Sequence, residues 1–362
     1  MLAFERPCRI GVTIGRREQE WRGFNVLAVE DFGHLPNGET IKRATIRGGG
    51  LVASILSFGA TVQDLRLDGH APPLVLGFPE FEPYPTHGQF FGAIVGRYAN
   101  RIANGRFAIG GSEFEVDRNF LGRHMLHGGA DGIWHRNWAI AQAEPDRVTL
   151  ALSDRDGEMG FPGNCEISVV FSLPGDGTLA ISMRATSDKA TVVNLAHHGY
   201  FNLDGSDTVL DHELQINAGH YTPVDAELIP TGEIAPVVGT ELDFTRLRAI
   251  RWQAGGKQVL YDHNYCLSGV RTGLREVAKV ASVKSGLTMT LSTTEPGLQY
   301  YAGEHLGETA PGLGGKPYGQ YAGLCLEPQV WPDAPNRPDF PGALLRPGET
   351  YRQETQYRFS RG

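Results

Sequence analysis

Only four cysteines occur among the 362 residues, Cys8, Cys165, Cys266 and Cys325, and none has the short paired spacing of a zinc site or a redox dithiol. At least Cys266 and Cys325 lie in apolar runs. Isolated cysteines in such runs are typical of reduced core residues. The pattern therefore indicates a protein of the cytosol, without a disulfide framework.

The sequence also has no run of lysines or arginines, and its formal net charge is -8. A chain of this charge is not expected to bind nucleic acid or an anionic membrane surface. No apolar stretch approaches membrane-spanning length, and Glu5, Arg6 and Arg9 stand where a signal peptide needs its apolar core. We therefore expect a cytoplasmic protein, a monomer or a homodimer, whose partner is a small neutral molecule.

Helical periodicity is largely missing, whereas 47 glycines and 22 prolines provide many turns. Short β-rich runs alternate with turn residues, and the clearest pair is joined by Pro174-Gly175-Asp176-Gly177. Residues 275–284 could form a short helix, but the Ser285-Gly286 turn and the run after it favour a hairpin. Strands are predicted at residues 45–47, 51–57, 60–67, 148–153, 166–171, 178–184, 212–217, 275–284, 287–293 and 351–359.

This pattern predicts an all-β fold, a sandwich or a barrel. Residues 39–362 show neither an internal repeat nor a low-complexity linker, and we expect them to form a single domain. Residues 1–38 have no clean period, and we expect them to be an irregular N-terminal extension.

One stretch, Gly323 to Glu327, ends an apolar run in a carboxylate and continues with Pro328 into a proline-rich loop. The sequence predicts a buried strand that stops at Glu327. A carboxylate between Leu326 and Pro328, close to Trp331, would be partly desolvated, which raises its pKa toward the range useful for proton transfer. A surface glutamate at a strand end is the alternative.

Five further segments carry chemically able side chains beside glycine or aromatic residues, at 96–107, 125–129, 194–203, 261–265 and 296–301. Each alone is compatible with a structural role: a salt bridge for Arg97 or Arg101, a hydrogen-bonded turn for His127. If the third segment is a strand, His197 and His198 point to opposite faces, so only one of them can face a site.

Together these segments resemble the aldose 1-epimerases, the galactose mutarotase family. The shared motifs follow the family's order over residues 40–360, at Gly96–Ile102, Leu126–Gly129, Asn194–Leu203, Asp262–Asn264, Pro296–Gln299 and Leu326–Asn336. The resemblance implies a large antiparallel β-sandwich. It also implies an isomerase that binds a free aldose, such as galactose, glucose or a pentose, and interconverts its α and β anomers without a cofactor or a metal.

The resemblance further implies individual roles. Glu327 corresponds to the general base, His198 to the general acid and His127 to a second active-site histidine. The residues that correspond to the sugar-binding positions are Asn100, Arg101, Tyr200, Asp262 and Gln299.

The chemistry of mutarotation needs such a pair. One proton leaves the C1 hydroxyl while another reaches the ring oxygen, the ring opens to an aldehyde, and the reverse transfers close it on the other face after rotation about C1–C2. Each positioned proton transfer contributes about 10²- to 10⁴-fold. Trp331 or Phe201 is expected to stack on the apolar face of the sugar.

Three positions depart from the family pattern. His197 stands where many members have asparagine, Pro328 where threonine is frequent, and Glu304, near the expected rim of the site, where asparagine is common.

Rival functions stay open at this point. His127, His198, Asp262 and Glu327 include enough ligands for zinc or manganese, although they are scattered singly. Asp262 and Glu327 could form the carboxylate pair of a glycoside hydrolase. The same fold could also serve as a non-catalytic sugar-binding or regulatory module, or as a hexose-phosphate epimerase. An acid and a base together favour catalysis over binding alone.

Overall fold

Alternating burial runs along the longest strands. In β12 (Cys165–Gly175) and β29 (Tyr351–Arg361), every second side chain is buried over most of the length. Each strand therefore has one apolar face and one face toward solvent, and a sheet of such strands must cover its apolar face with a second layer. The computed structural model describes residues 28–87 and 90–361, and these provide both layers.

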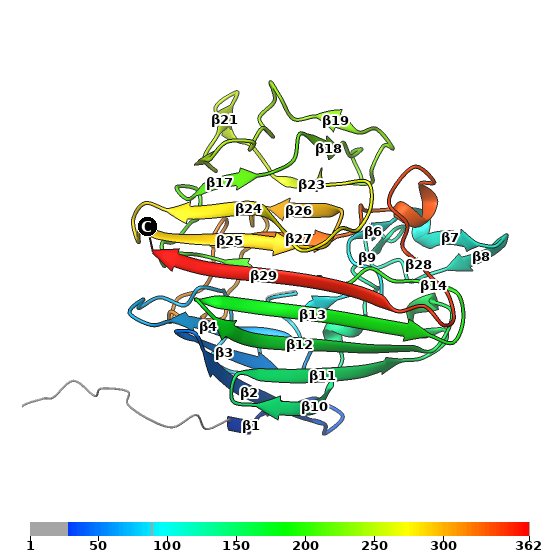
Figure 1. Ribbon diagram of the computed structural model, residues 1–362, viewed down its shortest axis with the longest axis horizontal. Coiled ribbons are helices and arrows are strands. Elements are labelled where there is room, and N and C mark those ends of the chain that lie inside the picture. The colour runs from blue at the N-terminus through cyan, green and yellow to red at the C-terminus, as the bar shows by residue number, and fades with distance from the viewer. Residues whose placement is uncertain (1–27, 88–89, 362) are drawn as a thin grey trace, which may run out of the picture.

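The first layer is a nine-stranded antiparallel sheet whose long strands cross the front of the molecule in Figure 1. Its order is β10 (Ala139–Glu144), β11 (Arg147–Asp154), β12, β13 (Thr178–Ser187), β29, β25 (Leu287–Thr293), β24 (Arg275–Ser282), β17 (Glu213–Ile216) and β20 (Arg248–Ala249).

The second layer is a six-stranded antiparallel sheet, accompanied by a separate four-stranded sheet. The six-stranded order is β16 (Tyr200–Phe201), β27 (Leu324–Gln329), β26 (Gly297–Tyr301), β23 (Asp262–Cys266), β18 (His220–Thr222) and β19 (Ala235–Pro236). The four-stranded order is β1 (Ala28–His34), β2 (Thr40–Gly48), β3 (Leu51–Leu56) and β4 (Thr61–Leu67).

Short elements complete the described residues. Two-stranded pairs join β14 (Thr191–Val192) to β28 (Leu344–Leu345), β15 (Ala196–His197) to β5 (Ile94–Val95), β6 (Arg101–Ile102) to β9 (Met125–Leu126), β7 (Arg106–Ile109) to β8 (Ser112–Glu115) and β21 (Gln253–Ala254) to β22 (Lys257–Gln258). Single 3-10 turns are η1 (Ala103–Gly105), η2 (Ile133–His135), η3 (Glu158–Gly160) and η4 (Ala334–Asn336). Within the described ranges, no helix has the length and apolar character needed to span a membrane.

The two large sheets share one core. Met183 and Tyr357 from the nine-stranded sheet belong to the same buried cluster as Leu298, Tyr300 and Leu326 from the six-stranded sheet. The hydroxyl of Tyr357 donates a hydrogen bond to the backbone oxygen of Leu326, 3.2 Å away, and so links the layers directly. The predicted all-β sandwich is confirmed.

The predicted strands of the middle and end of the chain are confirmed with small differences at their ends. The turn at residues 174–177 closes the β12–β13 hairpin, with Gly175 opposite Thr178. The segment at residues 275–284 is a strand, not a helix, because β24 pairs with β25 in the hairpin that the Ser285-Gly286 turn predicted.

The expected irregular extension contains a strand. Residues 28–34 form β1, which pairs with β2 along its length. Most side chains of β1 are exposed, so the segment has no apolar alternation for sequence reasoning to detect; backbone pairing and the ion pairs Asp31–Lys42 and Glu30–Arg43 hold it. Residues 1–27 lie outside the described residues, and the single domain stays a prediction.

The predicted end of the Glu327 strand was also wrong, because β27 continues through Pro328 to Gln329. The backbone oxygen of Pro328 accepts a hydrogen bond from the side chain of Gln353 in the other sheet, 2.9 Å away, so it points away from β26. In a strand the nitrogen of a residue points to the same side as its oxygen. The amide hydrogen that proline lacks would therefore face no neighbouring strand, and the ladder with β26 stays intact.

Candidate active site

The six-stranded sheet has one face in the core and one face toward a cavity, by simple alternation along its strands. On β27, Leu324 and Leu326 enter the core, whereas Glu327 lines the cavity. Gln299 of β26 lies directly opposite Glu327 in the register, and β23 adds Asp262 to the same wall. Residues that are distant in sequence therefore meet on one polar surface.

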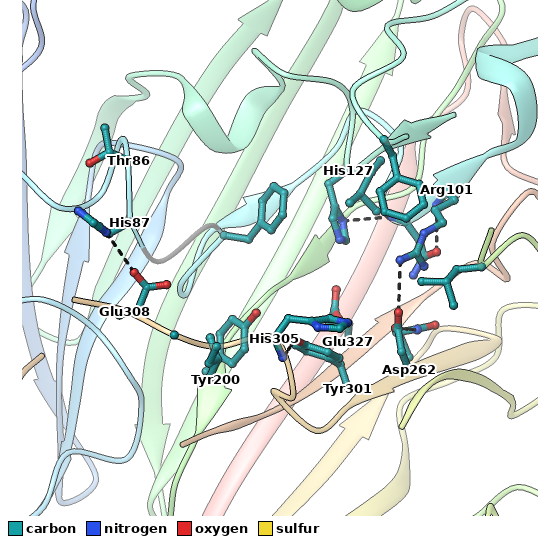
Figure 2. A pocket seen from close by; sticks show the side chains of 18 residues that line it. Thr86, His87, Arg101, His127, Tyr200, Asp262, Tyr301, His305, Glu308 and Glu327 are labelled. Carbon is teal, nitrogen blue, oxygen red and sulfur yellow. Dashed lines mark hydrogen bonds and ion pairs between the residues drawn. The ribbon is translucent and has the colours of Figure 1, made fainter. Parts of the chain in front are cut away.

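The cavity has a volume of about 560 Å³, which lies in the range of small-molecule sites. Figure 2 shows its labelled side chains converging from several strands and loops. The predicted site residues in its wall are Asn100, Arg101, His127, Tyr200, Asp262, Gln299 and Glu327.

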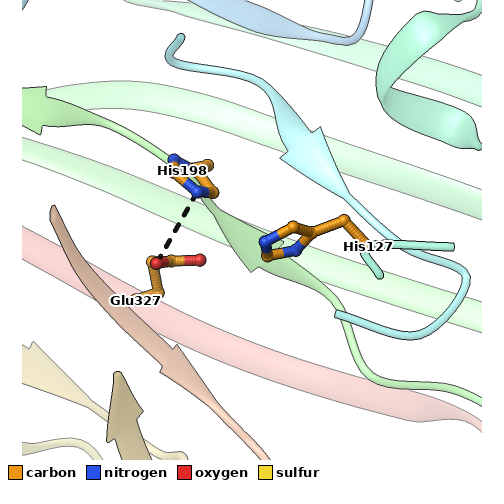
Figure 3. Close-up of side chains that lie close together, drawn as sticks. All are labelled: His127, His198 and Glu327. Carbon is orange, nitrogen blue, oxygen red and sulfur yellow. Dashed lines mark ion pairs between the residues drawn. The ribbon is translucent and has the colours of Figure 1, made fainter. Parts of the chain in front are cut away.

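His198 and Glu327 form a buried pair at the inner end of the site (Figure 3). Their side chains are 6% and 2% exposed, and Nε2 of His198 lies 3.8 Å from Oε1 of Glu327. This distance exceeds that of a hydrogen bond, and Oε2 of Glu327 has no hydrogen-bond partner among the described residues. Glu327, which lines the cavity, can therefore bind a substrate oxygen as a new partner, whereas His198 is not among the residues in the cavity wall.

Burial sets the proton balance of this pair. Desolvation raises the pKa of Glu327 well above its usual value, with a smaller contribution from the charge of Asp262. Desolvation also lowers the pKa of His198 to about 4. Both pKa shifts favour neutral side chains, with the proton on the carboxyl group of Glu327 and a neutral imidazole at His198. The alternative form has a carboxylate on Glu327 and an imidazolium on His198. The two forms contain the same number of protons, and transfer of one proton between the carboxyl group and Nε2 converts one into the other.

His127 enters the cavity from a tight turn. The backbone is left-handed at both His127 (φ 51°) and Gly128 (φ 87°). A Cβ atom at Gly128 would lie 1.8 Å from the backbone oxygen of Gly96, so only glycine fits at this position. Nδ1 of His127 accepts the backbone N–H of Asn100 at 3.2 Å. The proton of the neutral ring therefore sits on Nε2. Burial lowers the pKa of His127 well below its usual value, and the charges of His198 and Arg101 lower it further. The ring is therefore neutral and can donate a hydrogen bond from Nε2.

Arg101, Asp262 and Gln299 form a hydrogen-bonded chain along the cavity wall. Nη2 of Arg101 lies 3.2 Å from Oδ2 of Asp262, and Nε2 of Gln299 donates to Oδ1 of the same carboxylate at 2.5 Å. The guanidinium carbon lies 4.7 Å from the centre of the Phe120 ring. Nε of Arg101 and Oε1 of Gln299 have no partner within the described structure, so this wall offers a donor and an acceptor to hydroxyl groups.

A metal centre has to be considered again, because the fold brings possible ligand atoms of His127, His198 and Glu327 within 4.8 Å of one another. The ring of His127 does not suit a metal, since Nδ1 accepts the Asn100 amide and Nε2 then carries the proton. His198 and Glu327 would remain, which is fewer than the three protein ligands of a catalytic zinc. The residues present do not fit a metal site.

Two predicted aromatic contacts were wrong. Trp331 packs against Phe340 and donates its indole N–H to the backbone oxygen of Pro296, and Phe201 is fully buried in the core. Phe201 occupies the core face of its strand because it follows Tyr200, which lines the cavity. The aromatic rings in the cavity wall are those of Phe90, Phe120, Tyr200 and Tyr301.

The doubled histidine and the two arginines divide between site and scaffold. His197 contacts the hydroxyl of Tyr357 at 3.4 Å in the core, whereas His198, the first residue after β15, faces Glu327. The two rings therefore point to different sides, as predicted. Arg97 is 1% exposed and pairs with Asp154 at 2.8 Å, so it is structural, whereas Arg101 lines the cavity.

Sequence reasoning missed several residues of the cavity wall. Tyr301 follows Gln299 by two positions on β26, so strand periodicity could have found it. The loops contribute residues that no motif marked, and their positions depend on tertiary contacts such as the 3.4 Å approach of His87 to Glu308. These loop residues are Thr86, His87, Phe90, Phe120, Leu228, His305, Leu306, Gly307 and Glu308.

Glu304 was expected near the rim, but it is 4% exposed, and Oε2 has no partner among the described residues. Burial raises its pKa from 4.5 to about 8. Between these values the unfolded chain loses a proton that the folded protein keeps, so stability falls as pH rises through this window and is then constant.

Glu304→Gln is therefore expected to increase stability at pH 8, relative to pH 5, by on the order of a few kcal/mol. Urea unfolding of both proteins at the two pH values measures the change. The exposed strand residue Glu113, replaced by Gln, controls for the loss of one charge. A difference between the Glu304→Gln variant and wild type that is equal at pH 5 and pH 8 would contradict the prediction.

Comparison with known proteins gives an independent view of the chain. Residues 42–358 match the sequence profile of the family described as aldose 1-epimerase. The chain is 42% identical over 336 residues to galactose mutarotase of Mus musculus, covering 91% of this chain and 97% of that protein. It is 39% identical over 336 residues to aldose 1-epimerase of Escherichia coli K12, covering 90% and 96% of the two chains.

Solved structures agree with this relationship. An aldose epimerase homologue from C. elegans superimposes with a TM-score of 0.82 at 32% identity, covering 88% of this chain and 99% of that chain.

Proposed function

This chain belongs to the aldose 1-epimerase family, and we therefore propose that it interconverts the α and β anomers of free aldoses, with Glu327 as general base and His198 as general acid. The observation that carries the assignment is the buried pair at 3.8 Å, one side chain of which lines a cavity of monosaccharide size. The related proteins support the same isomerase activity.

In the proposed reaction the carboxylate of Glu327 takes the proton of the C1 hydroxyl, and the imidazolium of His198 gives its Nε2 proton to the ring oxygen. The C1–ring oxygen bond breaks, C1 becomes an aldehyde, and the pair is left in its neutral form. Burial favours that form, so both transfers remove charge from a desolvated site. After rotation about C1–C2, the same transfers run backwards and close the other anomer.

The remaining wall holds the sugar during rotation. Nε of Arg101 can donate a hydrogen bond to a sugar hydroxyl, and Oε1 of Gln299 can accept one. The Nε2–H of His127 provides a further neutral donor beside His198 and Glu327. Tyr200 and Asn100 also line the cavity.

Arg101→Ala is expected to lower kcat/KM by about 10- to 100-fold, because a charged hydrogen bond contributes about 1.5–3 kcal/mol. The loss should exceed any effect on folding. Steady-state rates with α-D-galactose, together with the melting temperature, separate the two effects.

The exposed Arg123, replaced by Ala, is the matched control. A large fall in melting temperature with kcat/KM preserved would make Arg101 a structural residue instead.

A glycoside hydrolase is not favoured by this geometry. Both oxygens of Asp262 are hydrogen-bonded, to Arg101 and Gln299, so the contacts hold this group in the wall as an acceptor and not as the free second carboxylate of a hydrolase pair.

A phosphorylated hexose is also disfavoured. Arg101, the one arginine that the described residues place in the wall, is already paired with Asp262, and Glu308 adds negative charge at the far end. A phosphate group would meet more carboxylates than unpaired cations.

Optical rotation tests the function directly. Freshly dissolved α-D-galactose and α-D-glucose should reach anomeric equilibrium faster with the wild-type protein, and glucose 6-phosphate should be accelerated much less. No acceleration with any free aldose, in folded protein, would overturn the proposal. A cytosolic location and a monomeric or homodimeric state remain predictions.

A further inference from the structure

The general acid has an unusual neighbour behind it. Sγ of Cys325 lies 3.6 Å from Nδ1 of His198, on the side opposite the Nε2 that faces Glu327. Within the described residues, no other side chain is recorded in hydrogen-bond contact with the His198 ring. Imidazoles that move protons are held by a partner on their second nitrogen, which fixes the orientation of the ring.

The geometry of β27 sets the position of the thiol. Cys325 is two residues before Glu327 on β27, so both side chains leave the same face of the strand. Tyr200 of β16 lies opposite Cys325 in the register and also contacts the thiol. Cys325 is fully buried, so its sulfur is a fixed part of the wall that supports His198.

We infer that Cys325 is a positioning residue for His198, whose thiol holds Nδ1 in both protonation states of the ring. Because His198 loses and regains its proton at Nε2, Nδ1 keeps its hydrogen in both protonation states and donates it to the sulfur of Cys325. No proton leaves the cysteine. This inference rests on the proposed role of His198 as the general acid.

The chemistry explains why a thiol suits this position. A carboxylate at Nδ1 would favour the imidazolium strongly and would add a second buried negative charge beside Glu327. A thiol is neutral and can serve as donor or acceptor. Burial raises the pKa of Cys325 well above its usual value, so it stays protonated. An acid that must lose and regain its proton in each turnover is thereby oriented without a bias toward either form.

The other groups around His198 do not replace the thiol. The rings of Phe90, Tyr200 and His127 have centroids 5.4, 5.1 and 5.1 Å from that of His198, and they restrict its plane by packing. Glu327 faces Nε2. None of these contacts fixes rotation of the ring nitrogens as the sulfur at Nδ1 does.

The test compares Cys325→Ala, which removes the partner, with Cys325→Ser, whose hydroxyl oxygen can still accept the hydrogen bond from Nδ1–H. We expect Cys325→Ala to lower kcat for α-D-galactose on the order of tenfold with KM within about twofold, because misorientation costs the proton transfer and not binding. Cys325→Ser should recover most of the loss. Cys165→Ala is the control, since Cys165 is an equally buried thiol in the core between the sheets.

The outcomes separate this inference from the proposed function. If the wild-type protein is active and the Cys325→Ala variant has the same kcat, the role of Cys325 is overturned and the proposed function stands. Equal losses in the Ala and Ser variants, or a loss of the same size in Cys165→Ala, would mark a packing effect and also overturn it. Wild type that accelerates no aldose would instead refute the function itself. Circular dichroism and urea unfolding of each variant establish that the folded protein is being compared.

Discussion

Glu327→Gln is expected to slow the interconversion of α- and β-D-galactose by about 10²- to 10⁴-fold, the contribution of one positioned proton transfer. Glutamine has the shape of glutamate but cannot take the C1 proton. The change is largest in kcat, because the amide can still accept and donate hydrogen bonds to a bound sugar. Polarimetry at several galactose concentrations separates kcat from KM.

The fold should tolerate this substitution well. Glu327 is 2% exposed and has no hydrogen-bond partner at Oε2 in the described structure, so a neutral amide removes a desolvated acid rather than an essential contact. Urea unfolding is expected to give a stability equal to or above that of wild type.

His198→Asn is the companion variant, and its kcat should fall within the same range. The double variant should lose little more than the worse single variant, because acid and base act in one step. A rate within about twofold of wild type in either single variant would refute the assigned role.

Arg97→Met is expected to reduce the free energy of unfolding by about 3–5 kcal/mol, the usual effect of removing one partner of a buried ion pair. Nε of Arg97 binds Asp154 at 2.8 Å, and Nη1 binds the backbone oxygens of Pro162 and Gly163 at 2.8 and 2.9 Å. Methionine fills much of the volume but leaves the carboxylate of Asp154 and these oxygens without donors.

Chemical denaturation measures the loss, and Arg251→Met provides the matched control. Arg251 pairs with Asp211 at 2.8 Å, but both side chains are largely exposed, so about 1 kcal/mol or less is expected there. The folded fraction of Arg97→Met should keep its kcat, since Arg97 lies outside the cavity wall. Equal destabilisation by the two substitutions would contradict the structural role of Arg97.

The all-β class and most strands of the nine-stranded sheet could be predicted from the sequence alone. Local information suffices for these features: alternation at every second residue sets which face of a strand is buried, and glycine-rich turns set where it reverses. The hairpin at residues 174–177 and the β24–β25 hairpin follow from such local signals. The edge strand β1 does not, because its exposed side chains have no alternation.

The motifs also identified part of the cavity wall, because short polar segments beside glycines stand out from strand patterns. They could not separate Arg97 from Arg101, or assign Trp331 and Phe201 to the core. Those outcomes depend on which side chain finds a partner in space: Asp154 for Arg97, Pro296 for Trp331.

The chemistry of the site follows from contacts that form only in the folded protein. The 3.8 Å approach of His198 to Glu327, the tautomer of His127 and the sulfur beside Nδ1 of His198 depend on contacts between residues that are up to 129 positions apart. Proton affinities follow from burial and from neighbours, and both are properties of the packed sheets. The motifs predict which residues act as acid and base, whereas packing sets the proton affinity of each side chain.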